Sequence, residues 1–139
     1  MSKAKPLRPK AALSLRQPWA WLVVNGFKDI ENRKWATNFR GPILIHSAKG
    51  MTLEEYSACE RFCEKVWRGR RGLFVLPPFE TLQRGGIVGQ VTIVDCVNSH
   101  VSPWFTGPYG FVVTDPKIIE FERTRGRLGI FQIKEASCR

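Results

Sequence analysis

The stretch that decides the fold is Leu13–Gly50, which reads LSLRQPWAWLVVNGFKDIENRKWATNFRGPILIHSAKG. Near its middle, the motif Gly26-x-Lys28-x-x-Glu31-x-Arg33 follows a short amphipathic segment. Few structural needs place a glycine, a lysine, a carboxylate and an arginine so close together. A shared polar site does. Alternation along the expected strand places Glu31 and Arg33 on one face, and Lys28 meets them only if it lies in the turn before the strand or a bulge intervenes.

The segments around the motif predict a small α+β fold. A helix is expected to begin at Pro18, because proline suits the first helical position, and to end at Asn25-Gly26. Its buried face is predicted from residues at helical spacing: Ala20, Val23, Val24 and Phe27. A second helix is expected over 52–67, where Thr52 and Glu55 form a capping box and Cys59 and Cys63 face the core. Strands are expected at 12–15, 29–35, 43–45, 86–97 (bent near Gly89), 110–114 and 128–133. Five to six short strands with two main helices predict a small β-barrel with helices at its ends.

Charge is the most unusual property of the composition. The 139 residues, enough for one domain, include 22 Lys and Arg against 12 Asp and Glu, a formal net charge of +10. This excess favours a polyanionic partner, of which nucleic acid is the most common. A basic, solvated surface without a specific ligand is the alternative.

Several classes of protein are disfavoured by the sequence. No stretch approaches the roughly 18–20 consecutive apolar residues of a membrane span. Residues 1–10 carry four basic residues and two prolines without an apolar run, which is typical of a flexible basic arm rather than a secretory signal. A cytoplasmic protein is therefore expected, or a nuclear one in a eukaryote. The spacing of Cys59, Cys63, Cys96 and Cys138 fits core packing better than a metal clip or a disulfide framework, so we expect no metal and no cofactor.

Four segments together resemble a known family. LSLRQPWAWLVVNGFKDIENR, RGPILIHSAK, GPYGFVV and GRLGIF are similar to the corresponding parts of ASCH domains, which belong to the PUA-like barrel superfamily. The resemblance implies an ASCH domain over residues 11–135, with a PUA-like barrel whose cleft contains the motif and binds RNA or a nucleotide.

The resemblance also raises the question of catalysis. Some members of the family remove acetyl groups from acetylated cytidine, and others are linked to RNA cleavage. Their catalytic lysine corresponds to Lys28, but their catalytic threonine corresponds to Glu31, and the further glutamate expected after the central strand is absent from 96–114. If this chain is an enzyme, a ribonuclease or an acetylcytidine-type amidohydrolase, Lys28 and Glu31 are its expected catalytic residues. A lysine beside a carboxylate stays charged, which suits an anion ligand or an oxyanion better than a general base.

Two sets of residues are expected to contact RNA. The ligand-binding set is Arg16, Gln17, Trp19, Lys28, Glu31, Arg33, Arg40, His46, Lys49 and Trp104. The set expected to position phosphates, in glycine-containing turns, is Arg68, Arg70, Arg71, Arg123, Arg125 and Arg127. Lys28 is expected at the exposed barrel mouth, and Trp104 is expected to be the most exposed tryptophan. Three alternatives stay open: a Glu31–Arg33 pair that only orders the fold, a purely structural His46, and a basic protein-interaction module.

Overall fold

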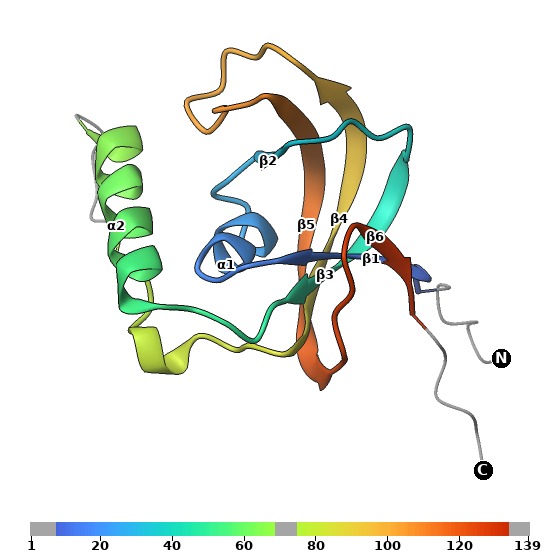
Figure 1. The fold of residues 1–139 in the computed structure, drawn as a ribbon, viewed down its shortest axis with the longest axis horizontal. Helices are drawn as coiled ribbons and strands as arrows, with labels where there is room; N and C mark the ends of the chain where they lie inside the picture. Colours follow the sequence, from blue (N-terminus) through green and yellow to red (C-terminus); the bar gives the residue numbers. More distant parts are fainter. Residues whose placement is uncertain (1–7, 69–74, 134–139) are drawn as a thin grey trace, which may run out of the picture.

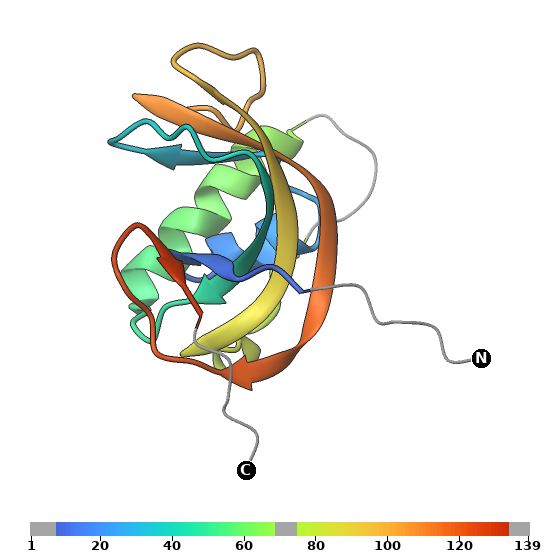
Figure 2. The ribbon, with the colours of Figure 1, turned by 90° about the vertical axis from the view of Figure 1, so that its right-hand side faces the viewer.

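The computed structural model describes residues 8–68 and 75–133. The described residues form one curled six-stranded sheet, and two α-helices lie on its concave side (Figures 1 and 2). The strands are β1 (Ala11–Leu15), β2 (Ile30–Arg33), β3 (Gly41–Ser47), β4 (Gly86–Val97), β5 (Tyr109–Arg123) and β6 (Ile130–Gln132). The helices are α1 (Trp19–Val24) and α2 (Leu53–Trp67), with a short 3-10 helix at Phe79–Thr81. The predicted α+β barrel of five to six strands with two main helices is confirmed.

The strand order is β2-β5-β4-β3-β1-β6. Strands β1 and β3 are parallel, and every other pair is antiparallel. The register between β4 and β5 shifts at three places along their length. Such irregularities increase the local twist and bend of a sheet, which accounts for the strong curl of these two long strands in Figure 2.

Helix α1 lies inside the curl and supplies the centre of the core (Figure 1). Val23 and Val24 are buried in one cluster with Ile43 and Val91 from the sheet. Gly89 allows this close approach, because a Cβ at that position would lie 2.4 Å from the Val24 side chain. The predicted bend at Gly89 coincides with one of the register shifts of β4.

Helix α2 packs outside α1 and closes a second core cluster. The predicted capping box is present: the Thr52 hydroxyl accepts from the Glu55 amide, and the Glu55 side chain accepts from the Thr52 amide. Cys59 and Cys63 are buried as predicted, in one cluster with Trp104. The loop that carries Trp104 is thereby fixed against α2.

Some predicted boundaries are wrong. The strand expected to end at Thr114 continues to Arg123. Asp115 takes a φ of 51° where the register with β4 shifts, and pairing with β4 resumes at Lys117. Phe27 was expected in the core but is 40% exposed; Leu22, at 0% exposure, occupies the buried face instead. Pro18 is the N-cap of α1 rather than its first residue.

Candidate nucleic-acid site

The motif forms a buried ion cluster immediately before and within β2. Helix α1 ends at Val24 with Asn25 as its C-cap, Gly26 takes a φ of +82°, and the amide of Lys28 donates to the Leu22 carbonyl, which turns the chain into the strand. Lys28 Nζ lies 3.3 Å from Glu31 Oε1, and Arg33 Nε lies 3.2 Å from Glu31 Oε2. One carboxylate thus pairs with two cations and leaves a net charge of +1. Lys28 lies in the turn before β2, which is the condition for its meeting with Glu31.

This ion cluster is more deeply buried than expected. The side chains of Lys28, Glu31 and Arg33 are 4%, 13% and 19% exposed, so the expectation of an exposed lysine at the barrel mouth is wrong. The physical reason is that Lys28 Nζ also donates to the Ile30 carbonyl and lies 5.6 Å from the centre of the Trp19 ring. Substitution of this lysine is therefore expected to cost stability as well as any function.

A pocket of about 370 Å³ opens beside the ion cluster. We call it the motif pocket; it is lined by Trp19, Lys28, Glu31, Asn32, Phe62, Trp104 and Thr106. Its walls are aromatic and its charged groups come from the motif. Flat aromatic walls beside hydrogen-bonding groups are suited to a planar, polar ring such as a nucleobase.

Trp104 lines this pocket as a buried residue, whereas the sequence predicts an exposed one. It was expected to be exposed but is only 3% exposed, since Phe62 stacks on it at 5.6 Å between ring centres and Trp67 packs edge-on at 5.3 Å. Asn32 holds the same loop: its amide donates to the Trp104 carbonyl, and its oxygen accepts from the Thr106 amide. The tryptophan is therefore a fixed pocket wall.

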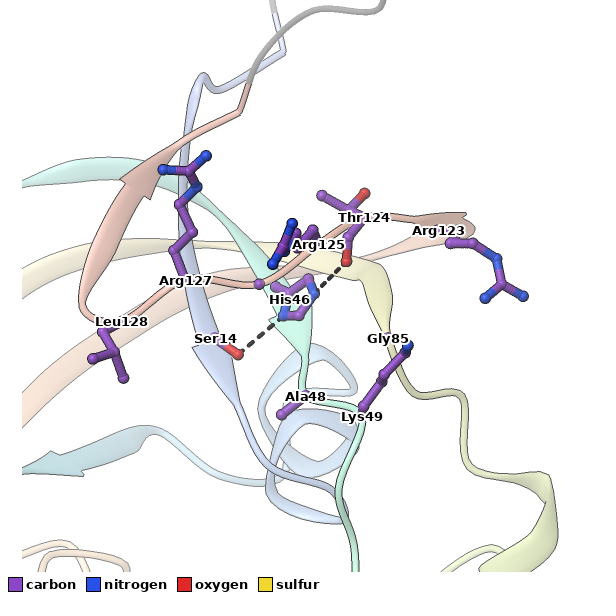
Figure 3. A pocket seen from close by; sticks show the side chains of 11 residues that line it. Ser14, His46, Ala48, Lys49, Gly85, Arg123, Thr124, Arg125, Arg127 and Leu128 are labelled. Atoms are coloured by element: carbon purple, nitrogen blue, oxygen red, sulfur yellow. Dashed lines mark hydrogen bonds between the residues drawn. The ribbon is translucent and has the colours of Figure 1, made fainter.

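A series of hydrogen bonds leads from the motif through Ser14 of β1 to His46 of β3 and Thr124 after β5. Arg33 donates to the Ser14 carbonyl at 2.7 Å, and Ser14 Oγ lies 3.0 Å from His46 Nδ1. His46 Nε2 lies 2.7 Å from the Thr124 carbonyl, as Figure 3 shows. A carbonyl only accepts, so Nε2 carries a hydrogen; in the neutral ring Nδ1 then accepts from the Ser14 hydroxyl. His46 is thus hydrogen-bonded on both nitrogens and only 3% exposed.

These hydrogen bonds lead to a larger pocket of about 810 Å³, which we call the basic pocket. It is lined by Ser14, His46, Ala48, Lys49, Gly85, Arg123, Thr124, Arg125, Gly126, Arg127 and Leu128 (Figure 3). Three of its cations are exposed: Arg123 at the end of β5, and Arg125 and Arg127 on the segment between β5 and β6. We refer to these three as the loop arginines. Six of the ten predicted ligand-binding residues are therefore divided between the two pockets.

Four residues of the predicted ligand-binding set line neither pocket: Arg16, Gln17, Arg33 and Arg40. Arg16 forms a two-pronged ion pair with Glu55 at the start of α2, at 2.5 and 2.6 Å. Hydrogen bonding from that guanidinium lowers the pKa of Glu55 to about 2. Gln17 is buried, where it accepts from the Trp21 amide and donates to the Gln83 carbonyl. These contacts give both residues structural partners.

The remaining predicted RNA contacts are Arg40 and the arginines at positions 68, 70 and 71. Arg40 donates to the carbonyls of Thr37 and Phe39, and its guanidinium lies 3.8 Å from Asp95, away from both pockets. Arg68 is exposed directly after α2. Arg70 and Arg71 lie outside the described residues.

Comparison with known proteins identifies the class of fold and then the family. The sheet with its two helices matches the crystal structure of ASCH from Zymomonas mobilis with a TM-score of 0.55, covering 90% of this chain and 87% of that one at 12% identity. The ASCH domain model matches residues 13–107. The chain therefore belongs to the ASCH domain family, and its fold is PUA-like.

Two curated relatives share sequence with the chain. Human Activating signal cointegrator 1 is 31% identical over 114 residues, which is 76% of this chain and 19% of the relative. The mouse protein of the same name is 35% identical over 86 residues, 62% of this chain and 14% of the relative. The chain thus corresponds to a fifth or less of the length of these proteins.

Within the described ranges, no helix combines the length and the apolar character needed to cross a bilayer.

Sequence reasoning missed several residues that line the pockets. Asn32, Phe62 and Thr106 complete the motif pocket, and Ser14 and Thr124 complete the series of hydrogen bonds. Asn32 lies inside the motif and could have been included on that ground. No spacing rule brings Phe62 or Thr106 to it, because helix α2 and the loop before β5 meet the motif only in the folded chain.

Proposed function

We propose that this ASCH domain, with its boundaries near residues 11 and 135, binds RNA and holds one base in the motif pocket. The observation that carries the proposal is the composition of that pocket. Trp19 and Phe62 offer partly exposed aromatic rings and Trp104 forms a fixed wall, while Lys28 and Glu31 offer a charged donor and acceptor at its edge. Stacking of a base on an aromatic side chain contributes roughly 1–3 kcal/mol in single-stranded nucleic-acid complexes.

The exposed cations support the same proposal. The net charge is +10, and Arg68 and the loop arginines are exposed. Exposed arginines bind phosphates without reading sequence, whereas a base in a pocket supplies whatever preference exists. The predicted residues are divided in the same way: aromatic residues line a pocket that suits a base, and arginines lie on a basic surface that suits phosphates.

The test is binding of a mixed pool of short single-stranded RNAs, followed by fluorescence anisotropy at low and moderate salt. We expect affinity to fall steeply with salt, because phosphate contacts release counterions. Thr106→Glu places a negative charge at the exposed rim of the motif pocket and is expected to weaken binding. Thr81→Glu is the matched control, since Thr81 is also exposed but lies on the 3-10 helix and outside both pockets. Undetectable binding at low salt, or equal effects of the two substitutions, contradicts the proposal.

A hydrolase that uses the same pocket is the second candidate. Its supporting observation is that Lys28 Nζ borders the motif pocket while paired with Glu31, so a fixed positive charge is available to stabilise an oxyanion or a phosphorane. Incubation with RNA and with acetylated cytidine, with and without divalent ions, distinguishes it from the first. If the protein neither cleaves RNA nor releases acetate, the hydrolase proposal is wrong and only the RNA-binding proposal is left.

A protein-interaction module that uses the basic surface remains the third reading from the sequence. Salt dependence alone does not distinguish this reading from RNA binding, because binding of an acidic protein also weakens with salt. The RNA titration is needed as well. Detectable, salt-dependent RNA binding that the Thr106→Glu substitution weakens favours the first proposal over this one.

A further inference from the structure

The basic pocket is distinguished by unneutralised charge. Its eleven lining residues include four cations, Lys49 and the loop arginines, and no carboxylate. Among residues 8–68 and 75–133, none of these four cations forms an ion pair. By contrast, five other basic residues each face a carboxylate: Arg8, Arg16, Lys28, Arg33 and Arg40. The positive charge of the pocket is therefore available to a ligand.

The floor and one wall of the pocket are held in place. His46 is fixed by Ser14 on one side and by the Thr124 carbonyl on the other. The Thr124 amide donates to the Gly85 carbonyl at 3.1 Å. Gly126 lets the loop lie directly against the imidazole, since a Cβ there would be 2.5 Å from His46 Cε1. The backbone that carries the loop arginines is thus anchored before any ligand arrives.

The cations surround this anchored floor. In the view of Figure 3, Arg125 lies over His46, Arg127 lies on one side, and Arg123 and Lys49 lie on the other. A phosphodiester in the middle of a strand carries one negative charge, whereas a phosphate monoester carries about −1.5 to −2 at pH 7 and three free oxygens. Several unpaired cations around one anchored pocket match the monoester better, because its larger charge and three free oxygens can engage more than one of them.

We propose that the basic pocket binds a nucleoside phosphate monoester, either the phosphorylated end of an RNA strand or a free mononucleotide. The proposal rests on the proposed function, and it adds that the protein distinguishes a phosphorylated end from a hydroxyl end. The loop arginines then hold the terminal phosphate while the motif pocket takes a base.

The experiment compares one short single-stranded RNA with a 5′-phosphate, with a 3′-phosphate and with hydroxyls at both ends. Anisotropy is measured with the dye on the end opposite to the phosphate, and each dye position has its own hydroxyl reference. We expect one phosphorylated end to tighten the dissociation constant about tenfold, close to the contribution of one charge-assisted hydrogen bond. Arg125→Ala is expected to remove that increment. The matched control is Arg61→Ala, because Arg61 is an exposed arginine on α2 outside both pockets.

A second arm uses free adenosine 5′-monophosphate, adenosine 3′-monophosphate and adenosine as competitors. If a monophosphate competes and adenosine does not, the site accepts a free nucleotide as well as a strand end. If the three RNAs bind equally and neither monophosphate competes better than adenosine, the inference is wrong while RNA binding stands. If no RNA binds but a monophosphate does so through Arg125, the proposed function is wrong while this inference stands. Equal losses in Arg125→Ala and Arg61→Ala also overturn the assignment of the site.

Discussion

Glu31→Gln tests whether the motif is one buried electrostatic unit. The substitution keeps the shape of the side chain but removes the charge that lies 3.3 Å from Lys28 and 3.2 Å from Arg33. Two cations whose side chains are 4% and 19% exposed then remain without their counterion. Breaking a buried pair by removing one partner costs about 3–5 kcal/mol, and the partial exposure of Arg33 places the expected loss near the lower limit, at about 3 kcal/mol.

The assay is urea unfolding at pH 7, and Glu55→Gln is the matched control. The Arg16–Glu55 pair is 49% and 32% exposed, and glutamine preserves the capping box, so its loss is expected to stay below about 1 kcal/mol. Addition of Lys28→Met to Glu31→Gln is expected to cost less than the sum of the single losses, since the second change removes one of the stranded cations. A loss for Glu31→Gln no larger than that for Glu55→Gln, or strict additivity, refutes the reasoning.

Three further predictions concern pH, packing and salt. The pKa of Glu55 is lowered from 4.5 to about 2 by its hydrogen bond with Arg16, so this pair stabilises the fold fully above pH 4.5 and no longer does so as the pH falls toward 2. In urea unfolding between pH 4.5 and 2, the free energy of unfolding is therefore expected to fall less for Glu55→Gln than for the unsubstituted protein. Gly89→Ala places a Cβ 2.4 Å from the Val24 side chain and 2.5 Å from the Lys117 carbonyl, and the free energy of unfolding in urea is expected to fall by about 2 kcal/mol or more. Replacement of all three loop arginines by alanine is expected to reduce the slope of log affinity against log salt by about 2 for single-stranded RNA, with similar loss for all sequences; an unchanged slope contradicts their role as phosphate ligands.

The parts of the fold that depend on local chemistry were predictable from the sequence. The capping box at Thr52, the glycine turn at Gly26 and the buried faces of Cys59 and Cys63 each follow from spacing along one element. The meeting of Glu31 with its arginine partner was also predictable, because alternation along a strand places them on one face, whereas the approach of Lys28 depended on a turn or a bulge before the strand.

The parts that depend on tertiary packing were not predictable in the same way. Trp104 lies in a loop of polar and small residues that suggests exposure, yet Phe62 and Trp67 from a helix some forty positions away cover it. Strand β5 passes through Asp115-Pro116, a pair that normally ends a strand, because β4 pairs with it on both sides of the irregularity. The basic pocket combines β1, β3 and the segment after β5, and a single sequence holds no signal for that juxtaposition.

The most direct measurement of the central claim is photocrosslinking of the intact protein to short single-stranded RNA that contains 4-thiouridine, with the crosslinked peptides identified by mass spectrometry. The account predicts crosslinks in the peptides that carry Trp19 and Trp104, because both residues line the motif pocket in which we propose that the base lies. Competition with unlabelled RNA is expected to remove them. Crosslinks confined to the outer face of α2, or none at a concentration where RNA binding is saturated, contradict the placement of the base and the central claim with it.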